Sequence, residues 1–110
     1  MYYSIKKANS RRIDESMTVI DLFSVESQPF DCVVCDLNGF HGKFINHKSD
    51  KYYMILEGTA VVKVEDEKYF VEKGDFIHIP KEHCHSIEGN VKFACISSPI
   101  YDWTTEDVID

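Results

Sequence analysis

The chain carries two glycine-bounded blocks that decide its fold, GFHGKFINHKSDKYYMILEG over residues 39–58 and GDFIHIPKEHCHSIEG over residues 74–89. Each block holds a histidine at a fixed offset from its glycines, His47 in the first and His85 in the second. Glycine suits tight turns because it adopts positive φ without a steric penalty. The blocks therefore predict strands joined by short turns, with His47 carried by the first block and His85 by the second.

Runs rich in β-branched and aromatic residues fill most of the remaining chain, and turn-forming residues separate them. Residues 59–65 alternate small or apolar side chains with polar ones, which is typical of a strand with one buried face. Single helical turns are expected around residues 10–16 and after Thr104. Many short strands at this spacing predict an all-β antiparallel sandwich or barrel. The expected strands cover residues 17–23, 30–37, 52–56, 59–65, 68–72, 76–79, 84–87 and 91–97.

Length and charge narrow the classes of function. A chain of 110 residues is enough for one domain, residues 1–110, with one core. The net charge of −7 and the scattered basic residues argue against a nucleic-acid partner. No apolar run reaches the roughly 20 residues that span a bilayer, and no signal peptide is recognised. We expect a cytoplasmic protein with no membrane partner; a small anionic ligand stays compatible with a locally positive pocket.

Four cysteines are present, and two of them, Cys32 and Cys35, form a C-x-x-C pattern. Such a pattern suits a redox pair or half of a zinc site. Here it lies in an expected strand, where residues three apart point to opposite faces, and no second C-x-x-C follows. We therefore expect all four cysteines to be small apolar side chains in a reducing compartment.

The two glycine-bounded blocks resemble the two signature motifs of the cupin superfamily, motif 1 at residues 39–58 and motif 2 at residues 74–89. The resemblance implies a double-stranded β-helix, a relative of the jelly roll, with one barrel end open over a pocket. Small cupins generally pair, so the resemblance also implies a homodimer.

The chain departs from the family pattern at the metal ligands. The family's first histidine is Ile45 here and its glutamate is Lys51, so only His47 and His85 match ligand positions. The resemblance thus leaves two alternatives, no metal at all or one divalent ion among Fe, Mn, Ni, Cu and Zn. A third ligand would have to come from Asp50, His83 or His78.

The first functional hypothesis is an isomerase or epimerase acting on a small, anionic or sugar-like molecule. In this hypothesis His47 or His85 is the base and Tyr53 the acid, while Lys51 stabilises an enolate or a phosphate. Each residue also has a structural alternative: a satisfied histidine, a solvated lysine or a tyrosine packed on the sheet. The expected substrate-binding residues are Lys51, Ile45 and His78, although His78 fits the outer face equally well.

Two further functions stay open. A metal-dependent dioxygenase or isomerase would use His47 and His85 with one extra ligand. A stand-alone cupin that binds a small molecule without catalysis would use the same pocket, since a fold does not fix a function.

Overall fold

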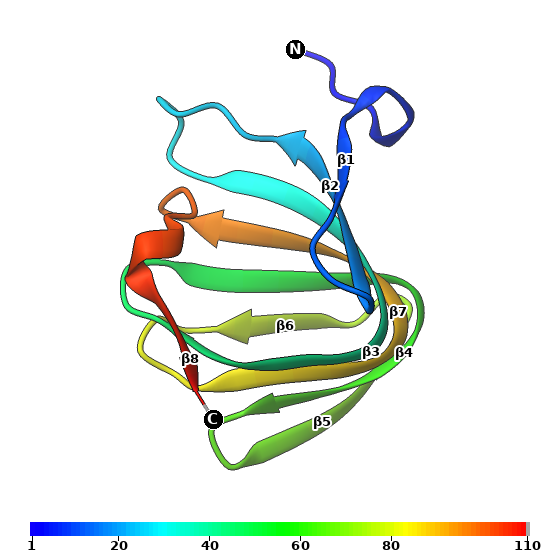
Figure 1. The fold of residues 1–110 in the computed structure, drawn as a ribbon, viewed down its shortest axis with the longest axis vertical. Coiled ribbons are helices and arrows are strands. Elements are labelled where there is room, and N and C mark those ends of the chain that lie inside the picture. The colour runs from blue at the N-terminus through cyan, green and yellow to red at the C-terminus, as the bar shows by residue number, and fades with distance from the viewer. Residues whose placement is uncertain (110) are drawn as a thin grey trace.

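The computed structural model describes residues 1–109 and contains a single antiparallel sheet that curls into an open barrel (Figure 1). Two short 3-10 turns accompany the strands, η1 at Ile5–Lys7 and η2 at Trp103–Thr105. The strands are β1 (Ser10–Arg12), β2 (Met17–Phe23), β3 (Asp31–Asn46), β4 (Asp50–Val64), β5 (Glu67–Glu72), β6 (Phe76–Ile79), β7 (His85–Ser98) and β8 (Glu106–Ile109).

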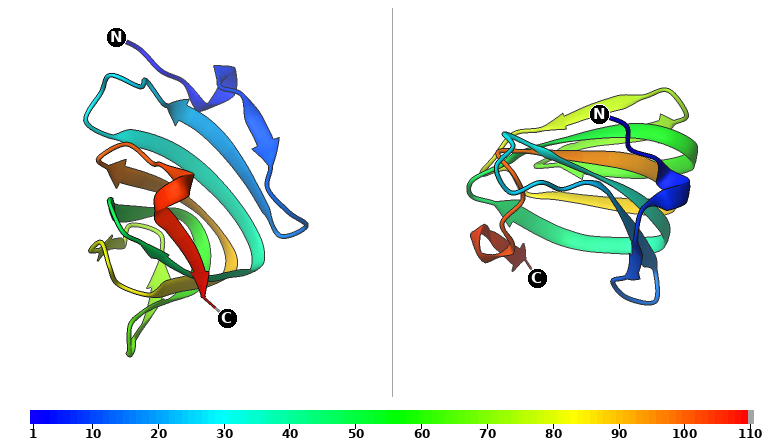
Figure 2. Two further views of the ribbon diagram at one scale, coloured as in Figure 1. Left: turned by 60° about the vertical axis from the view of Figure 1, so that its left-hand side comes forward. Right: turned by 90° about the horizontal axis from the view of Figure 1, so that it is seen from above.

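Three long strands form the frame, and they lie side by side in the order β3, β7, β4. The first part of β4 pairs with β6 on its free edge and the second part pairs with β5, so the sheet changes partners where β4 bends. Short strand β8 pairs with the last part of β3. Figure 2 shows how η2 and β8 cover the open side of the curled sheet. The predicted all-β antiparallel barrel is confirmed.

Several predicted elements differ in extent. The expected strands at 52–56 and 59–65 are one strand, β4, and those at 84–87 and 91–97 are likewise one strand, β7. The helical turn expected at residues 10–16 is wrong, because this segment starts with β1, which pairs with β2. The expected turn near Thr104 is the 3-10 turn η2, whose cap is the Asp102 carboxylate, and a strand follows it instead of a helix.

Gly58 explains how β4 can bend against β7. It adopts a φ of +79°, and a Cβ atom placed on it would lie only 2.1 Å from the carbonyl oxygen of Asn90. The bend therefore needs both the positive φ and the missing side chain of glycine. Beneath it lies the main core, whose fully buried members include Leu37, Ile55, Val62, Ile87 and Phe93.

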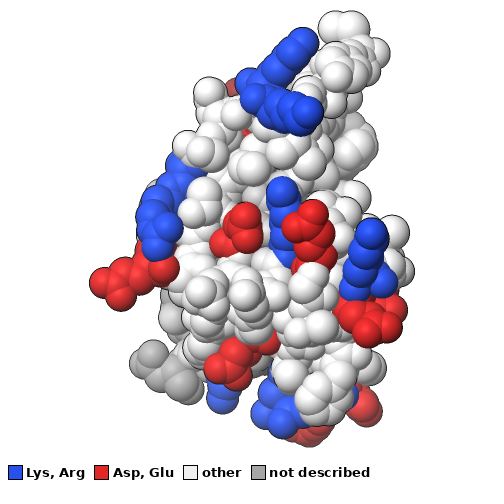
Figure 3. Space-filling view, turned by 90° about the vertical axis from the view of Figure 1, so that its right-hand side faces the viewer, with Lys and Arg blue, Asp and Glu red and all other residues white. Residues whose placement is uncertain are grey.

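The surface is mixed in charge. On the face shown in Figure 3, lysine and arginine side chains stand beside aspartate and glutamate side chains, and neither sign forms a continuous patch. Among residues 1–109, no helix has the length and apolar character needed to cross a bilayer.

Candidate active site in the barrel cavity

The barrel encloses a cavity of about 350 Å³ between the β1–β2 hairpin, the three long strands and the segment that carries β8. Inward-facing side chains of β3, β7 and β4 form its floor in cross-strand rows. The outermost row is polar and consists of Asp31, Ser97 and Lys51, which are direct neighbours across the sheet. The row below it consists of Val33, Cys95 and Tyr53. The cavity thus has a polar end and an apolar, aromatic depth.

An ion pair dominates the polar end. The ammonium group of Lys51 donates to one carboxylate oxygen of Glu106, and the hydroxyl of Tyr101 donates to the other. The two charged side chains are only 11% and 9% exposed, and the Lys51 ammonium lies 5.3 Å from the centre of the Tyr101 ring. Burial, followed by the hydrogen bond to Glu106, raises the pKa of Tyr101. Tyr101 therefore stays protonated and acts as a donor.

Asp31 is a second buried carboxylate at the same end. It is 6% exposed, and its Oδ2 accepts a hydrogen bond from the backbone N–H of Tyr101 at 3.0 Å. Burial is the main cause that raises its pKa, while the backbone donors of Tyr101 and Ser97 act in the opposite direction. The polar end of the cavity therefore holds two carboxylates, those of Asp31 and Glu106, and the charge of the Lys51 ammonium acts on both.

Tyr53 lies deeper, as its strand parity with Lys51 predicts. It is 3% exposed, and burial holds its pKa well above the ordinary value, so its hydroxyl is neutral. Within residues 1–109 this hydroxyl makes no side-chain hydrogen bond, although it lines the cavity. It is therefore free to bond to a ligand.

His85 lies behind Tyr53 rather than in the cavity. Its ring meets that of Tyr53 edge-on at 6.5 Å and that of Phe44 at 6.3 Å, and its Nδ1 lies 3.3 Å from the carbonyl oxygen of His83. Burial lowers the pKa of His85 to about 4, with the Lys51 charge as the next cause. The imidazole is therefore neutral near pH 7 and borders a separate hollow of about 200 Å³ on the far side.

His47 lies outside the barrel, so the expectation that it faces the pocket is wrong. A β-bulge between His41 and Phe44 shifts the alternation of β3. As a result Phe44 lines the cavity and Asn46 is buried, whereas His47 is exposed and Ile45, between these two inward positions, is on the outer side. The structure therefore does not bring His47 and His85 together.

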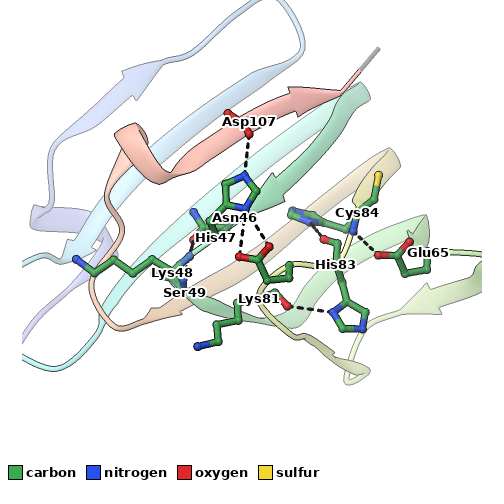
Figure 4. Close-up of polar contacts among 11 residues, drawn as sticks. Asn46, His47, Lys48, Ser49, Glu65, Lys81, His83, Cys84 and Asp107 are labelled. Atoms are coloured by element: carbon green, nitrogen blue, oxygen red, sulfur yellow. Dashed lines mark hydrogen bonds and ion pairs between the residues drawn. The ribbon is translucent and has the colours of Figure 1, made fainter.

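On the outside, His47 bridges two acidic residues (Figure 4). Its Nδ1 lies 3.0 Å from a carboxylate oxygen of Glu82 and its Nε2 lies 2.7 Å from one of Asp107. The hydrogen bond with Asp107, then that with Glu82, raises the pKa of His47. Since a neutral imidazole has only one N–H and carboxylates only accept, the double contact requires the protonated ring.

His78 also lies on the outer face, one of the two positions that the sequence allowed. Its ring stacks on Tyr52 at 4.8 Å, and its Nε2 lies 2.9 Å from Asp50. His41, by contrast, belongs to β3 and lines the cavity. Burial, with the Lys51 charge as second cause, lowers the pKa of His41, so this ring is also a neutral group.

The donor set does not fit a divalent metal ion. In the part of the chain that the structure describes, no three His, Cys, Asp or Glu side chains lie together as a metal site requires. His47 is exposed outside the barrel, whereas His85 is buried beside the Tyr53 ring, so the two imidazoles cannot bind one ion together. The thiols do not help, because burial strongly raises the pKa of Cys35 and Cys95.

Asp31, Tyr101 and Glu106 are the site residues that the sequence did not reveal. They come from the start of β3 and from the segment after β7, far from both motifs. The only sequence signal is the strand-like alternation of Glu106 with Asp107, which places the first side chain inward and the second outward.

Comparison with known proteins identifies the family. Residues 33–97, more than half of the chain, match the family described as Cupin domain, and the chain belongs to this family. A curated relative, an uncharacterized protein of Methanocaldococcus jannaschii, is 38% identical over 69 residues, which are 59% of this chain and 55% of the relative. The match therefore spans little more than half of that protein.

Solved structures share the fold at low sequence identity. The Streptomyces nucleoside dehydratase Pac13 is 16% identical with a TM-score of 0.86 over 99% of this chain and 90% of its own. KdgF from Halomonas sp. is 14% identical with a TM-score of 0.85 over 94% and 97%. A cupin-2 domain protein from Rhodospirillum rubrum is 18% identical with a TM-score of 0.83 over 100% and 80%. These likenesses establish the cupin barrel.

Proposed function

We propose that the barrel cavity binds a small hydroxylated molecule, of the size of a sugar or a nucleoside, and that its polar end performs acid–base chemistry on it. The observation that carries the proposal is the ion pair of Lys51 and Glu106, which is buried yet lines a cavity. A buried ion pair contributes little to stability compared with apolar side chains of similar volume. Its place in a pocket wall is therefore a reason to assign it a function.

The size and lining of the cavity support this class of ligand. A volume of about 350 Å³ lies at the small end of the range for ligand pockets. The free hydroxyl of Tyr53 and the neutral His41 ring suit ligand hydroxyls, and the Phe93 ring offers an apolar face. A structure of the Streptomyces protein was solved with uridine, a nucleoside. An anionic ligand has less support, because the Lys51 charge is already paired.

The chemistry follows from the positions of the groups. In an isomerisation or epimerisation, Glu106 takes a proton from the carbon next to a carbonyl of the substrate. Lys51 stabilises the negative charge that develops on the carbonyl oxygen, and Tyr53 donates a hydrogen bond to it. In an isomerisation, Glu106 then returns the proton to the former carbonyl carbon on the same face, and the proton of the neighbouring hydroxyl passes to the original carbonyl oxygen; an epimerisation needs a second acid on the opposite face. In this scheme Glu106 replaces His47, which lies outside, and His85 supports Tyr53 from behind.

A binding protein without catalysis is the second candidate. The ion pair satisfies both of its own members, and Tyr101 adds a further donor to the same carboxylate. A pair whose charges already compensate each other can fix the shape of a pocket without taking part in a reaction. The donor set gives no comparable support to a metal-dependent reaction.

The experiment has a binding step and a chemical step. A set of sugars and nucleosides is screened against the protein by ligand-observed NMR. Tyr53→Phe should weaken binding of the hits several-fold, whereas Tyr52→Phe, on the outer face, should not. If no compound binds, or if both variants behave alike, the cavity is not the binding site.

The second step separates an enzyme from a binder. Each hit that carries a carbonyl group is incubated with the protein in deuterated water, and exchange of its neighbouring C–H is followed by NMR. We expect exchange with the wild type and none with Glu106→Gln. Binding without any exchange would support the non-catalytic candidate.

A further inference from the structure

Five charged side chains line the cavity, and four of them are paired with one another. Lys51 pairs with Glu106, as described above. Arg11 donates from Nε and Nη2 to the two carboxylate oxygens of Asp21, at 2.9 and 3.0 Å. The fifth is Asp31, which forms no ion pair within residues 1–109, although the charge of Lys51 acts on it from a distance. After these pairings the single remaining charge in the cavity is a negative one.

Other lining groups offset this charge only in part. The His41 ring is neutral near pH 7, because burial and the nearby Lys51 charge lower its pKa. The backbone N–H groups of Tyr101 and Ser97 donate to Asp31, but each amide carries only a partial positive charge. The Lys51 ammonium lies one strand away across Ser97, and it is shared with Glu106. The polar end of the cavity therefore holds two carboxylates against one ammonium.

We propose that the natural ligand of this cavity carries a protonated amine, and that Asp31 is its counter-ion. The proposal rests on the proposed function, since it takes the cavity to be a small-molecule site, and it narrows the ligand to the class of amino sugars or similar hydroxylated amines. A buried carboxylate without a cation is unfavourable, and a ligand ammonium removes this cost by forming the missing pair.

The aromatic side chains that line the cavity also favour a positively charged ligand. The rings of Phe44, Tyr53, Phe93 and Tyr101 line the same cavity as Asp31. Aromatic faces attract ammonium groups, and this attraction is strongest where water is excluded. The same rings provide the apolar surface that packs against the carbon skeleton of a sugar. An anionic group would meet the unpaired charge of Asp31 instead.

Asp31 also has a simpler structural role, in which it only accepts hydrogen bonds from the backbone N–H groups of Tyr101 and Ser97. That role needs one acceptor oxygen, which an amide or a protonated carboxyl would also supply. Burial raises the pKa of Asp31, which means that the site already favours a positive partner or a proton over the free carboxylate. The structural reading leaves this cost unexplained, and an amine ligand offsets it.

The test compares three sugars that share the same pyranose ring and differ in charge: glucosamine is positive, glucose is neutral and glucuronate is negative. Their affinities are measured by titration calorimetry at pH 6.5 and low salt. We expect glucosamine to bind about tenfold more tightly than glucose, or better, and glucuronate to bind most weakly. Asp31→Asn should remove the preference for glucosamine, while Asp36→Asn, on the exposed face of the same strand, should keep it.

The outcomes separate the two proposals. If glucose or glucuronate binds as tightly as glucosamine, the cavity is a small-molecule site and only the amine inference fails. If no sugar and no nucleoside binds, the proposed function fails and the amine inference fails with it. The ranking in the wild type decides the question even if Asp31→Asn does not fold.

Discussion

The buried imidazole of His85 should make the barrel sensitive to acid. His85 is 3% exposed, and burial lowers its pKa from the ordinary 6.5 to about 4. Near pH 7.5 the ring is neutral in both the folded and the unfolded chain. As the pH falls below about 6.5, the unfolded chain binds a proton that the folded chain refuses, so stability falls until the folded pKa is reached.

The magnitude follows from the two pKa values of His85. Each unit of difference corresponds to about 1.4 kcal/mol, so the loss is about 2 kcal/mol at pH 5 and about 3 kcal/mol at pH 4. A domain of this size has a total stability of only about 5–15 kcal/mol. The contribution of this single side chain is therefore large enough to measure.

The assay is urea denaturation followed by circular dichroism between pH 8 and pH 5. The variant His85→Gln keeps an N–H donor for the His83 carbonyl but cannot titrate in this range. It should lose about 2 kcal/mol less than the wild type between these pH values. The buried His41 and all other side chains are common to both proteins, so the difference isolates His85, and His78→Gln on the outer face is the control. Equal losses in the wild type and in His85→Gln would refute the reasoning.

Two further predictions concern a turn and the surface. Gly58→Ala should destabilise the barrel more than Gly74→Ala. Both glycines have a positive φ, which costs alanine about 1–2 kcal/mol. Only at Gly58 would the added Cβ atom also clash with the backbone, because it would lie 2.1 Å from the carbonyl oxygen of Asn90. Thermal denaturation of the two variants measures this, and equal shifts would contradict the steric argument. The protonated His47 should stabilise the fold below its ordinary pKa, and this contribution should vanish as the pH rises through the raised folded value. The difference in Tm between the wild type and His47→Gln should thus be larger at pH 6 than at pH 9, and a constant difference would speak against the bridge.

The sequence predicts the barrel because its strands follow simple alternation. The period of two places Lys51 and Tyr53 on one face of β4, and both side chains do face the cavity. The same rule fails for His47, because the bulge in β3 adds a residue that no periodicity reveals. A shift of one residue turns every later side chain of the strand to the other face.

The site is less predictable than the fold because two residues of its polar end, Asp31 and Glu106, lie far in sequence from the two glycine-bounded blocks. Asp31 and Glu106 are separated by most of the chain and meet only through the pairing of β3 with β7 and with β8. The four cysteines are free, as expected, and Cys32 and Cys35 differ in burial as opposite strand faces require. The homodimer and the cytoplasmic location stay predictions.

Strand β8 has a consequence for how such a pocket can diversify. Its four residues pair only with the end of β3, yet they supply the Glu106 carboxylate inside and the Asp107 carboxylate outside. The buried core lies in other strands. Substitutions in this short segment can therefore change the reactive groups of the pocket while the barrel keeps its packing. For protein engineering, β8 is a short segment in which the pocket chemistry can be varied, provided that Lys51 is changed together with Glu106 so that no buried charge is left unpaired.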